Sequence, residues 1–108
     1  MVSYLSVLNT MFADITGFQW DQGNKDKNWK KHGIPWEECE EVFFNKPLLI
    51  QNDFKHSEKE NRFYALGKTN QEKKLFIVFT VRNNKVRVIS ARSMHKKEKD
   101  FYEKTSKY

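Results

Sequence analysis

The 108-residue sequence contains one cysteine, Cys39, together with two prolines and four glycines. A single cysteine cannot form an internal disulfide, and no second cysteine lies at the spacing of a zinc site. The histidines at positions 32, 56 and 95 are widely separated. We therefore expect no metal and no other cofactor, in a protein of a reducing compartment such as the cytoplasm.

Long apolar runs are also absent from the sequence. None approaches the roughly 20 residues needed to span a bilayer. The N-terminal residues lack the basic n-region of a secretory signal. We expect neither membrane insertion nor export, and we interpret residues 1–14 as a peripheral extension. Residues 15–108 are long enough for a single domain with one core.

Positive charge is spread unevenly along the sequence. Residues 1–24 contain no lysine or arginine, whereas residues 25–108 hold all 20 basic residues and 12 of the 14 acidic ones. From Arg82 onward there are nine basic and three acidic residues. Such a positive field attracts polyanions, so it favours nucleic acid as a partner, with an acidic protein as the alternative.

The hydrophobic pattern predicts an α+β domain. A short strand is expected at 15–20, helices at 22–31 and 35–43, strands at 48–51, 62–66, 75–81 and 86–91, and a basic helix after His95. The apolar run at 75–81 predicts a central strand covered on both faces. This order indicates a small curved antiparallel β-sheet with two N-terminal helices and one C-terminal helix.

The first predicted helix is a candidate RNA-binding surface. Its cations are Lys25, Lys27, Lys30, Lys31 and, at the C-terminal end, His32, and Asn28 lies among them. Lys27 and Lys31 lie one turn apart, and like charges at this spacing repel each other. An anion opposite them would remove the repulsion. A solvated basic face is the simpler interpretation.

A second group of candidates occupies every second position before and within the third strand: His56, Glu58, Glu60, Arg62 and Tyr64. If the strand begins early enough, all five side chains lie on one face. RNA cleavage without a metal needs a base for the ribose 2′-hydroxyl, an acid for the departing oxygen and cations for the phosphate. An exposed loop with local ion pairs is the alternative.

The third group lies where the last strand meets the last helix. Val86, Val88 and Ser90 are predicted on one face of the strand, opposite residues 87, 89 and 91. Arg92 ends the strand, and its planar guanidinium suits a phosphate. An ion pair with Glu98 or Glu103 is the alternative. The other candidates for RNA contact here are Arg82, Arg87, His95, Lys96 and Tyr102.

Several short motifs, taken together, resemble the BrnT toxins. They are FQWD at 18–21, N-x-x-KHG at 28–33, HSEKENRF at 56–63 and VRVISAR at 86–92, followed by KKEKDFYE at 96–103. Each motif alone is weakly specific, but their order and separations match the family over about residues 17–104. The motif positions are Trp20, Asp21, Asn28, Lys31, His32, Gly33, His56, Glu60, Arg62, Arg92, Glu98 and Tyr102.

This resemblance implies a RelE-like fold and a bacterial type II toxin that cleaves RNA without a metal and slows translation. It implies a ribbon-helix-helix antitoxin of the BrnA type, through which the complex binds operator DNA and represses its own operon. The residues expected to carry catalysis are Lys31, His32, Glu60, Arg62, Arg92 and Tyr102. Those expected to contact RNA are Lys25, Lys27, Arg82, Arg87, His95 and Lys96.

The sequence departs from the family pattern in two places. Asn24 stands where the family usually has lysine, and Lys25 beside it points about 100° away on a helix. Met94 and His95 stand where small and hydroxyl residues are common. If the usual lysine is catalytic, the chain could instead be an inactive interaction module or co-repressor. An extracellular basic ribonuclease is disfavoured because disulfides and a signal are lacking.

Overall fold

The structure is a computed structural model that describes residues 15–105, so the extension predicted at residues 1–14 lies outside the described part. In chain order the elements are β1 (Gly17–Phe18), α2 (Gln22–His32), α3 (Trp36–Phe44), β2 (Leu49–Asn52), the 3₁₀ turn η1 (Phe54–His56), β3 (Arg62–Lys68), β4 (Lys74–Arg82), β5 (Lys85–Ser93) and α4 (Lys96–Thr105). This order confirms the predicted α+β class.

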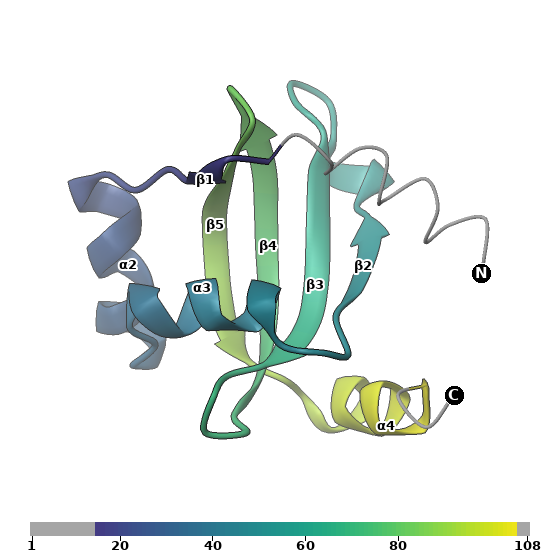
Figure 1. Cartoon of the computed structure of the whole chain (residues 1–108). Coiled ribbons are helices and arrows are strands. Elements are labelled where there is room, and N and C mark those ends of the chain that lie inside the picture. Colours follow the sequence, from purple (N-terminus) through teal and green to yellow (C-terminus); the bar gives the residue numbers. More distant parts are fainter. Residues whose placement is uncertain (1–14, 106–108) are drawn as a thin grey trace.

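The described strands form one sheet in the order β1-β5-β4-β3-β2. Strands β2 to β5 are antiparallel neighbours, as predicted. The short β1 runs parallel to β5 and pairs Phe18 with Val86, so the sheet is mixed rather than wholly antiparallel. In Figure 1, α3 crosses one face of the sheet, α2 lies beside β5, and α4 lies at the lower end.

Both ends of α2 follow from local chemistry. Asp21 is the N-cap, because its carboxylate accepts from the backbone N–H of Asn24 at 2.9 Å while the Asn24 side chain accepts from the Asp21 N–H. Gly33 ends the helix with a φ of 68°, a left-handed conformation that glycine adopts without a Cβ clash. The helix predicted from the sequence is therefore confirmed.

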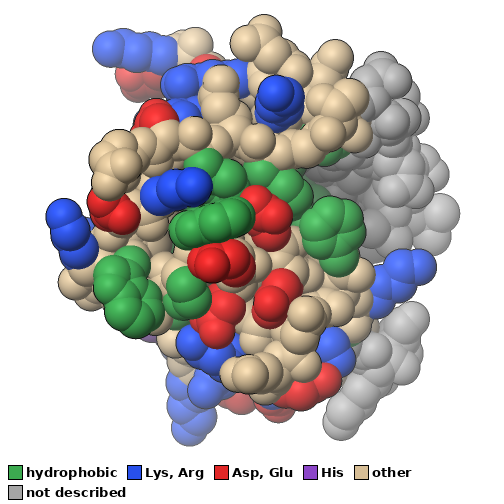
Figure 2. All heavy atoms as spheres, turned by 60° about the vertical axis from the view of Figure 1, so that its left-hand side comes forward, with side chains coloured by type: hydrophobic (Ala, Val, Ile, Leu, Met, Phe, Trp, Pro, Cys, Tyr) green, Lys and Arg blue, Asp and Glu red, His purple; other side chains and the backbone are tan. Residues whose placement is uncertain are grey.

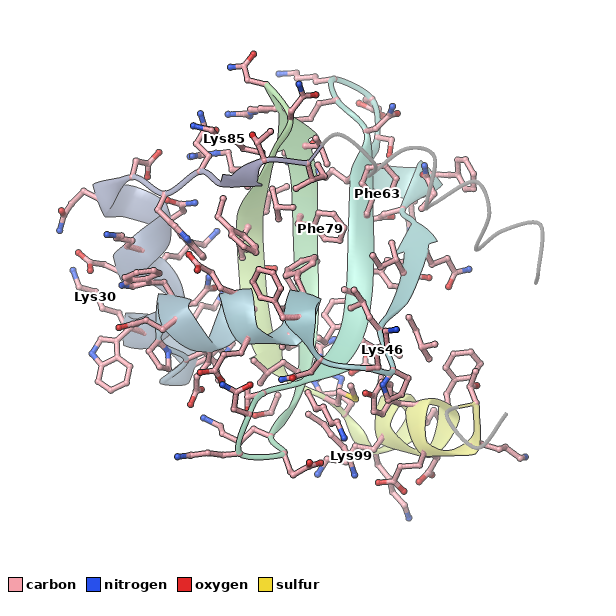
Figure 3. All side chains as sticks on the ribbon, in the orientation of Figure 1. Lys30, Lys46, Phe63, Phe79, Lys85 and Lys99 are labelled. Carbon is pink, nitrogen blue, oxygen red and sulfur yellow. The ribbon has the colours of Figure 1, made fainter. Side chains whose placement is uncertain are left out.

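The core lies between α3 and the sheet. Cys39 and Val42 of α3 are fully buried, and Phe43 meets Phe79 edge to face with 5.1 Å between ring centroids. Figure 3 shows Phe63 and Phe79 pointing from the strands toward this helix. Burial raises the pKa of the Cys39 thiol to about 12, so this cysteine stays protonated and belongs to the core.

Strand β4 corrects one prediction. Leu75, Ile77 and Phe79 are fully buried beneath α3, but Phe76 and Val78 on the opposite face are only half-buried. Its sequence is apolar on both faces although helix α3 covers one of them. An aromatic and a β-branched side chain are thus left at the surface of the second face.

Strand β5 corrects another, because it contains a β-bulge. Val78 pairs with Ser90 and Phe79 with Val88, so Ile89 is an extra residue. After the bulge, the side chains of β5 point to the opposite faces from those that strict alternation predicts. Ala91, not Ser90, joins Val86 and Val88 in the core, and Ser90 turns to the same face as Arg87.

Helix α4 packs at one end of that second face. Tyr102 and Met94 bury Leu66, with Leu49 and Phe76 at the edge of this small cluster. The Tyr102 hydroxyl donates to the Pro47 carbonyl at 2.6 Å, which ties the helix to the loop before β2. The rest of the second face is not covered by a described helix.

Candidate functional site: the arginine face

We call the side of the sheet turned away from α3 the arginine face. The strand register defines it, because residues paired across neighbouring strands point to the same side. Arg62 pairs with Thr80 and Thr80 with Arg87. The face comprises Gln51, Arg62, Tyr64, Phe76, Val78, Thr80, Arg82, Arg87, Ser90 and Arg92. All four arginines of the sequence therefore share one surface.

Arg62 differs from the other three arginines. Within residues 15–105 its guanidinium has neither a hydrogen bond nor an ion pair, although it lies close enough to Glu60 to lower the pKa of that carboxyl group. The side chain is half-buried at the first residue of β3. Holding a guanidinium here without a carboxylate partner leaves its planar set of donors available to an anion.

Arg82 and Arg87 lie at the same end of the face as Arg62, but each is paired. Arg82 donates from two nitrogens to the Glu60 carboxylate, both at 3.0 Å. This hydrogen bond is the main reason that the pKa of Glu60 lies below its usual range. Arg87 donates to Asp21 at 2.7 Å. Both pairs are partly exposed, so exchange of a carboxylate for a phosphate costs little.

Arg92 lies at the other end of the face. Its guanidinium makes a bidentate contact with Glu98, at 2.8 and 2.9 Å, and lies 4.1 Å from the centre of the Phe76 ring. The Glu98 carboxylate also accepts from the backbone N–H of His95 at the start of α4. These contacts lower the pKa of Glu98, with the Arg92 hydrogen bond as the largest cause. The ion-pair alternative for Arg92 is therefore realised.

The two proposed phosphate ligands Arg62 and Arg92 share a face but do not meet at one point. Their partners on β4, Thr80 and Phe76, are four residues apart, and two strand spacings separate β3 from β5. Standard strand dimensions place their backbones roughly 16 Å apart on the diagonal. The prediction that both residues converge on a single phosphodiester is therefore wrong. They lie at two separate ends of one surface.

Two asparagine side chains of α2 hydrogen-bond to the backbone of β5 beyond the point where its pairing with β1 ends. The Asn24 amide donates to the carbonyls of Gln19 and Val88, each at 3.3 Å. One turn later, Asn28 accepts from the backbone N–H of Ala91 at 3.0 Å. Both asparagines are buried. Asn24, for which the family resemblance predicted a lysine, thus has a structural role that the sequence did not reveal.

Apart from Lys30, on the outer side of the helix, the cations of α2 divide into two groups. Lys25 contacts the Trp36 ring of α3, 4.5 Å from its centre. At about 100° per residue, His32 returns to this same side, and it is exposed there. Lys27 and Lys31 point roughly the opposite way, past the buried asparagines toward the arginine face. By helical geometry Lys31, but not His32, therefore lies on the side of α2 nearer that face.

Other predicted site residues lie apart from the arginine face. Strand β3 begins only at Arg62, and His56 sits in η1 with its Nδ1 2.9 Å from Asp53. Within the strand, the predicted one-face row therefore reduces to Arg62 and Tyr64, although the Glu60 carboxylate reaches the end of the arginine face by its contact with Arg82. Tyr102 is only 2% exposed, and its hydroxyl donates to the Pro47 carbonyl, so the side chain packs α4 onto the sheet and is not presented at the surface. His95 and Lys96 are exposed where α4 begins.

Three residues on the arginine face escaped the sequence analysis as candidates: Gln51, Phe76 and Val78. Tyr64 was considered only as part of the longer row. Gln51 gave no signal as a site residue, and Phe76 and Val78 lie in an apolar run whose sequence does not say which face a helix will cover.

The described residues contain no group of three or more histidine, cysteine, aspartate or glutamate side chains that could hold a metal ion. Among those same residues, no helix has the length and apolar character needed to cross a membrane.

Two comparisons connect this architecture to known proteins. A model of the family described as ribonuclease toxin, BrnT, of type II toxin-antitoxin system matches residues 20–98. The crystal structure of the Brucella abortus ribonuclease toxin BrnT superposes with a TM-score of 0.56 at 21% identity. That match covers 75% of this chain and 99% of the Brucella chain. No curated protein sequence matches significantly.

The class of protein follows from the fold and from the family match together. This is a ribonuclease toxin of a type II toxin-antitoxin system. More specifically, the chain belongs to the BrnT family, whose pattern covers the chain from Trp20 to Glu98 and so includes every described strand except β1.

Proposed function

We propose that this chain is a metal-independent endoribonuclease that cleaves RNA on the arginine face and thereby inhibits translation in the cytoplasm. A ribbon-helix-helix antitoxin of the BrnA type neutralises it, and the complex binds operator DNA through the antitoxin to repress its own operon. Membership of a ribonuclease toxin family supports the activity and the existence of an antitoxin. The metal independence, the antitoxin type, the autoregulation and the RelE-like kinship are proposals.

The observation that carries the proposal is the Arg62 guanidinium, which has no carboxylate partner within residues 15–105, near the ionised Glu60 carboxylate. In the proposed reaction Arg62 binds the scissile phosphate, and Glu60 accepts the proton of the ribose 2′-hydroxyl. The 2′-oxygen then attacks phosphorus, and the bond to the 5′-oxygen breaks. The products are a 2′,3′-cyclic phosphate and a 5′-hydroxyl, which takes up a proton. Arg82 stabilises negative charge on the phosphate.

Residues at the other end of the face bind neighbouring phosphates in this proposal. Arg92 is held in place by Glu98, and Lys31 approaches from the rim. A strand of RNA that crosses the face diagonally reaches both cationic ends, which the roughly 16 Å between them allows. Tyr102 supports α4 in this scheme, and Lys25 and His32 stand outside it because they lie on the α3 side of α2.

Cleavage of RNA by the purified chain in EDTA tests the proposal. We expect cleavage by the unmodified chain, and Arg62→Ala should lower its rate roughly 100-fold, as loss of a donor to the transition-state charge does. Lys30→Ala is the matched control, since it removes one positive charge from the outer side of α2 (Figure 3). A chain that cuts RNA only when a divalent metal is present would refute the metal-independent mechanism.

Glu60→Gln separates catalysis from binding. The variant removes the proposed base but keeps the shape of the side chain, so cleavage should fall about 100-fold or more. Binding of RNA should not weaken, because one negative charge has left the face. Undiminished cleavage would show that another group is the base.

The second candidate function is an inactive interaction module or co-repressor, and the buried Asn24 favours it. This side chain cannot act on RNA, whereas the family usually has lysine at the position. If the unmodified chain cuts RNA no faster than Arg62→Ala, this second function is supported.

A further inference from the structure

A stack of flat groups occupies the centre of the arginine face. The Tyr64 and Phe76 rings are nearly parallel, at 25°, with 5.5 Å between their centroids. The Arg92 guanidinium lies over Phe76 as well, 4.1 Å from the ring centre. Phe76 is thus engaged by both neighbours. Tyr64 is half-buried, so part of its ring remains at the surface.

Gln51 completes this group from the neighbouring strand. Tyr64 pairs with Gln51 across β2 and β3, and the Tyr64 hydroxyl donates to the Gln51 side-chain oxygen at 2.8 Å. This bond directs the glutamine amide nitrogen away from the tyrosine. Gln51 is exposed, and no described residue accepts from that nitrogen. The chain therefore presents an amide donor beside an aromatic ring.

Arg62, whose guanidinium has no partner in the described part of the chain, lies two residues from Tyr64 on the same strand and face. Side chains at this spacing are about 7 Å apart. A ring, an oriented amide and a free guanidinium thus lie together on one surface. Nucleotides have a flat base with hydrogen-bonding edges and a phosphate beside it, which fits these three groups in turn.

We propose that Tyr64 and Gln51 form a base-binding subsite for an unpaired nucleotide of single-stranded RNA. The base stacks on the Tyr64 ring, the Gln51 amide donates to its edge, and Arg62 holds the adjoining phosphate. This inference rests on the proposed function, and it specifies the substrate as single-stranded, because a base in a duplex would first have to lose its stacking and its pairing partner to reach the Tyr64 ring.

Binding of a short single-stranded RNA with methylated 2′-hydroxyls tests the subsite without cleavage. We expect Tyr64→Leu to weaken binding about 10-fold, since the leucine has no ring on which a base can stack. Tyr64→Phe is the matched control, because it keeps the ring, and its affinity should stay within about 3-fold of the original. Fluorescence anisotropy at fixed salt measures each dissociation constant.

Duplex RNA of equal length provides the contrast. Its binding depends on phosphate charge, so Tyr64→Leu should leave it unchanged. Equal binding of the single strand by Tyr64→Leu and the unmodified chain would overturn the subsite. Equal losses for both RNAs would also overturn it.

Gln51→Ala tests the subsite independently of the core. The side chain is exposed, so the variant should fold even if Tyr64→Leu does not. We expect the differences in affinity among single-stranded homopolymers of the four bases to shrink to within about 2-fold. An unchanged preference in a folded Gln51→Ala variant would contradict the role of this amide.

Polyglutamate distinguishes RNA from an acidic protein as the occupant. It should bind less tightly than the single strand, and Tyr64→Leu should not alter its affinity. A loss for polyglutamate as large as for RNA would overturn the proposal. A chain that binds methylated RNA through Tyr64 but never cuts unmodified RNA would refute the proposed catalysis and leave the subsite standing.

Discussion

On the side of the sheet that α3 covers, Phe63, Ile77 and Phe79 are at most 2% exposed. On the arginine face, opposite the same strands, four arginines surround a half-buried aromatic pair. The first side is held by burial of apolar area, which is nondirectional and insensitive to pH. The second is held by partly exposed ion pairs and ring contacts. The apolar core and the proposed RNA surface thus lie on opposite sides of one sheet.

Charge also differs between the two sides of the molecule, because the outer side of α3 is acidic and the arginine face is basic. Figure 2 shows hydrophobic and acidic side chains gathered on this side of the molecule, and α3 supplies four glutamates at 37, 38, 40 and 41. Trp29 and Phe44 are exposed by 59% and 77%. The net charge of +6 is therefore an average over a basic sheet face and an acidic helix.

The largest expected effect comes from the α3 side. Phe79→Ala removes a fully buried ring that contacts Phe43 and Phe63, and should lower the free energy of unfolding by about 3–5 kcal/mol. Denaturant unfolding measures the loss. Phe54→Ala is the control, because that ring is 84% exposed and its removal should cost less than about 0.5 kcal/mol. Similar losses for both variants would contradict the assignment of the core.

A smaller effect is expected at the edge between the two faces. Asn28→Ala leaves the buried Ala91 N–H without its acceptor, which should destabilise the fold by about 1–3 kcal/mol. Denaturant midpoints measure this, and hydrogen exchange should show faster opening at Ala91 than at Ile77 in the centre of the sheet. Unchanged exchange at Ala91 would mean that α2 does not secure this edge.

Acid should weaken the arginine face before it affects the core. The Arg92 hydrogen bond lowers the pKa of Glu98 in the folded state, so the pair's stabilisation is complete above about pH 4.5, the ordinary value, and is lost as pH falls through the lower folded value. Glu98→Gln should flatten the pH dependence of unfolding in this acidic range, by less than about 1 kcal/mol. An unchanged slope would show that the pair contributes nothing to stability.

The smallest effect should come from the exposed aromatic residue on the far side of α2. Trp29→Ala should change the free energy of unfolding by less than about 0.5 kcal/mol and leave RNA affinity unchanged. Comparison with Tyr64→Leu then shows whether RNA affinity depends on any exposed aromatic ring or on a ring that lies on the arginine face. Loss of RNA binding in Trp29→Ala would extend the RNA surface onto the α2 side.

Much of the fold could be predicted because helix caps, turns and apolar stripes depend on residues that are close together in the sequence. Asp21 and Gly33 bracket α2 by capping chemistry, and Asn83 and Asn84 turn β4 into β5 with φ values of 52° and 62°. The stripe containing Cys39 and Val42 predicts the buried side of α3. The bulge at Ile89 was missed, because a single extra residue leaves no sign in an alternating run.

The candidate site was only partly predictable. Arg62 and Arg92 share a face, as the strand register shows, while their role in binding phosphate stays a prediction. Sequence could not show which arginines have carboxylate partners, since Asp21 and Arg87 lie 66 residues apart. It also could not show that Asn24 is committed to Gln19 and Val88.

By itself the sequence determined the order of helices and strands, the single core and the excess of positive charge, because each depends on neighbouring residues or on simple sums. Only the tertiary structure decided which arginine has no carboxylate partner among residues 15–105 and which side of β4 no helix in that range covers. Pairing and coverage depend on segments distant in the chain, and their positions follow from packing rather than from any local pattern.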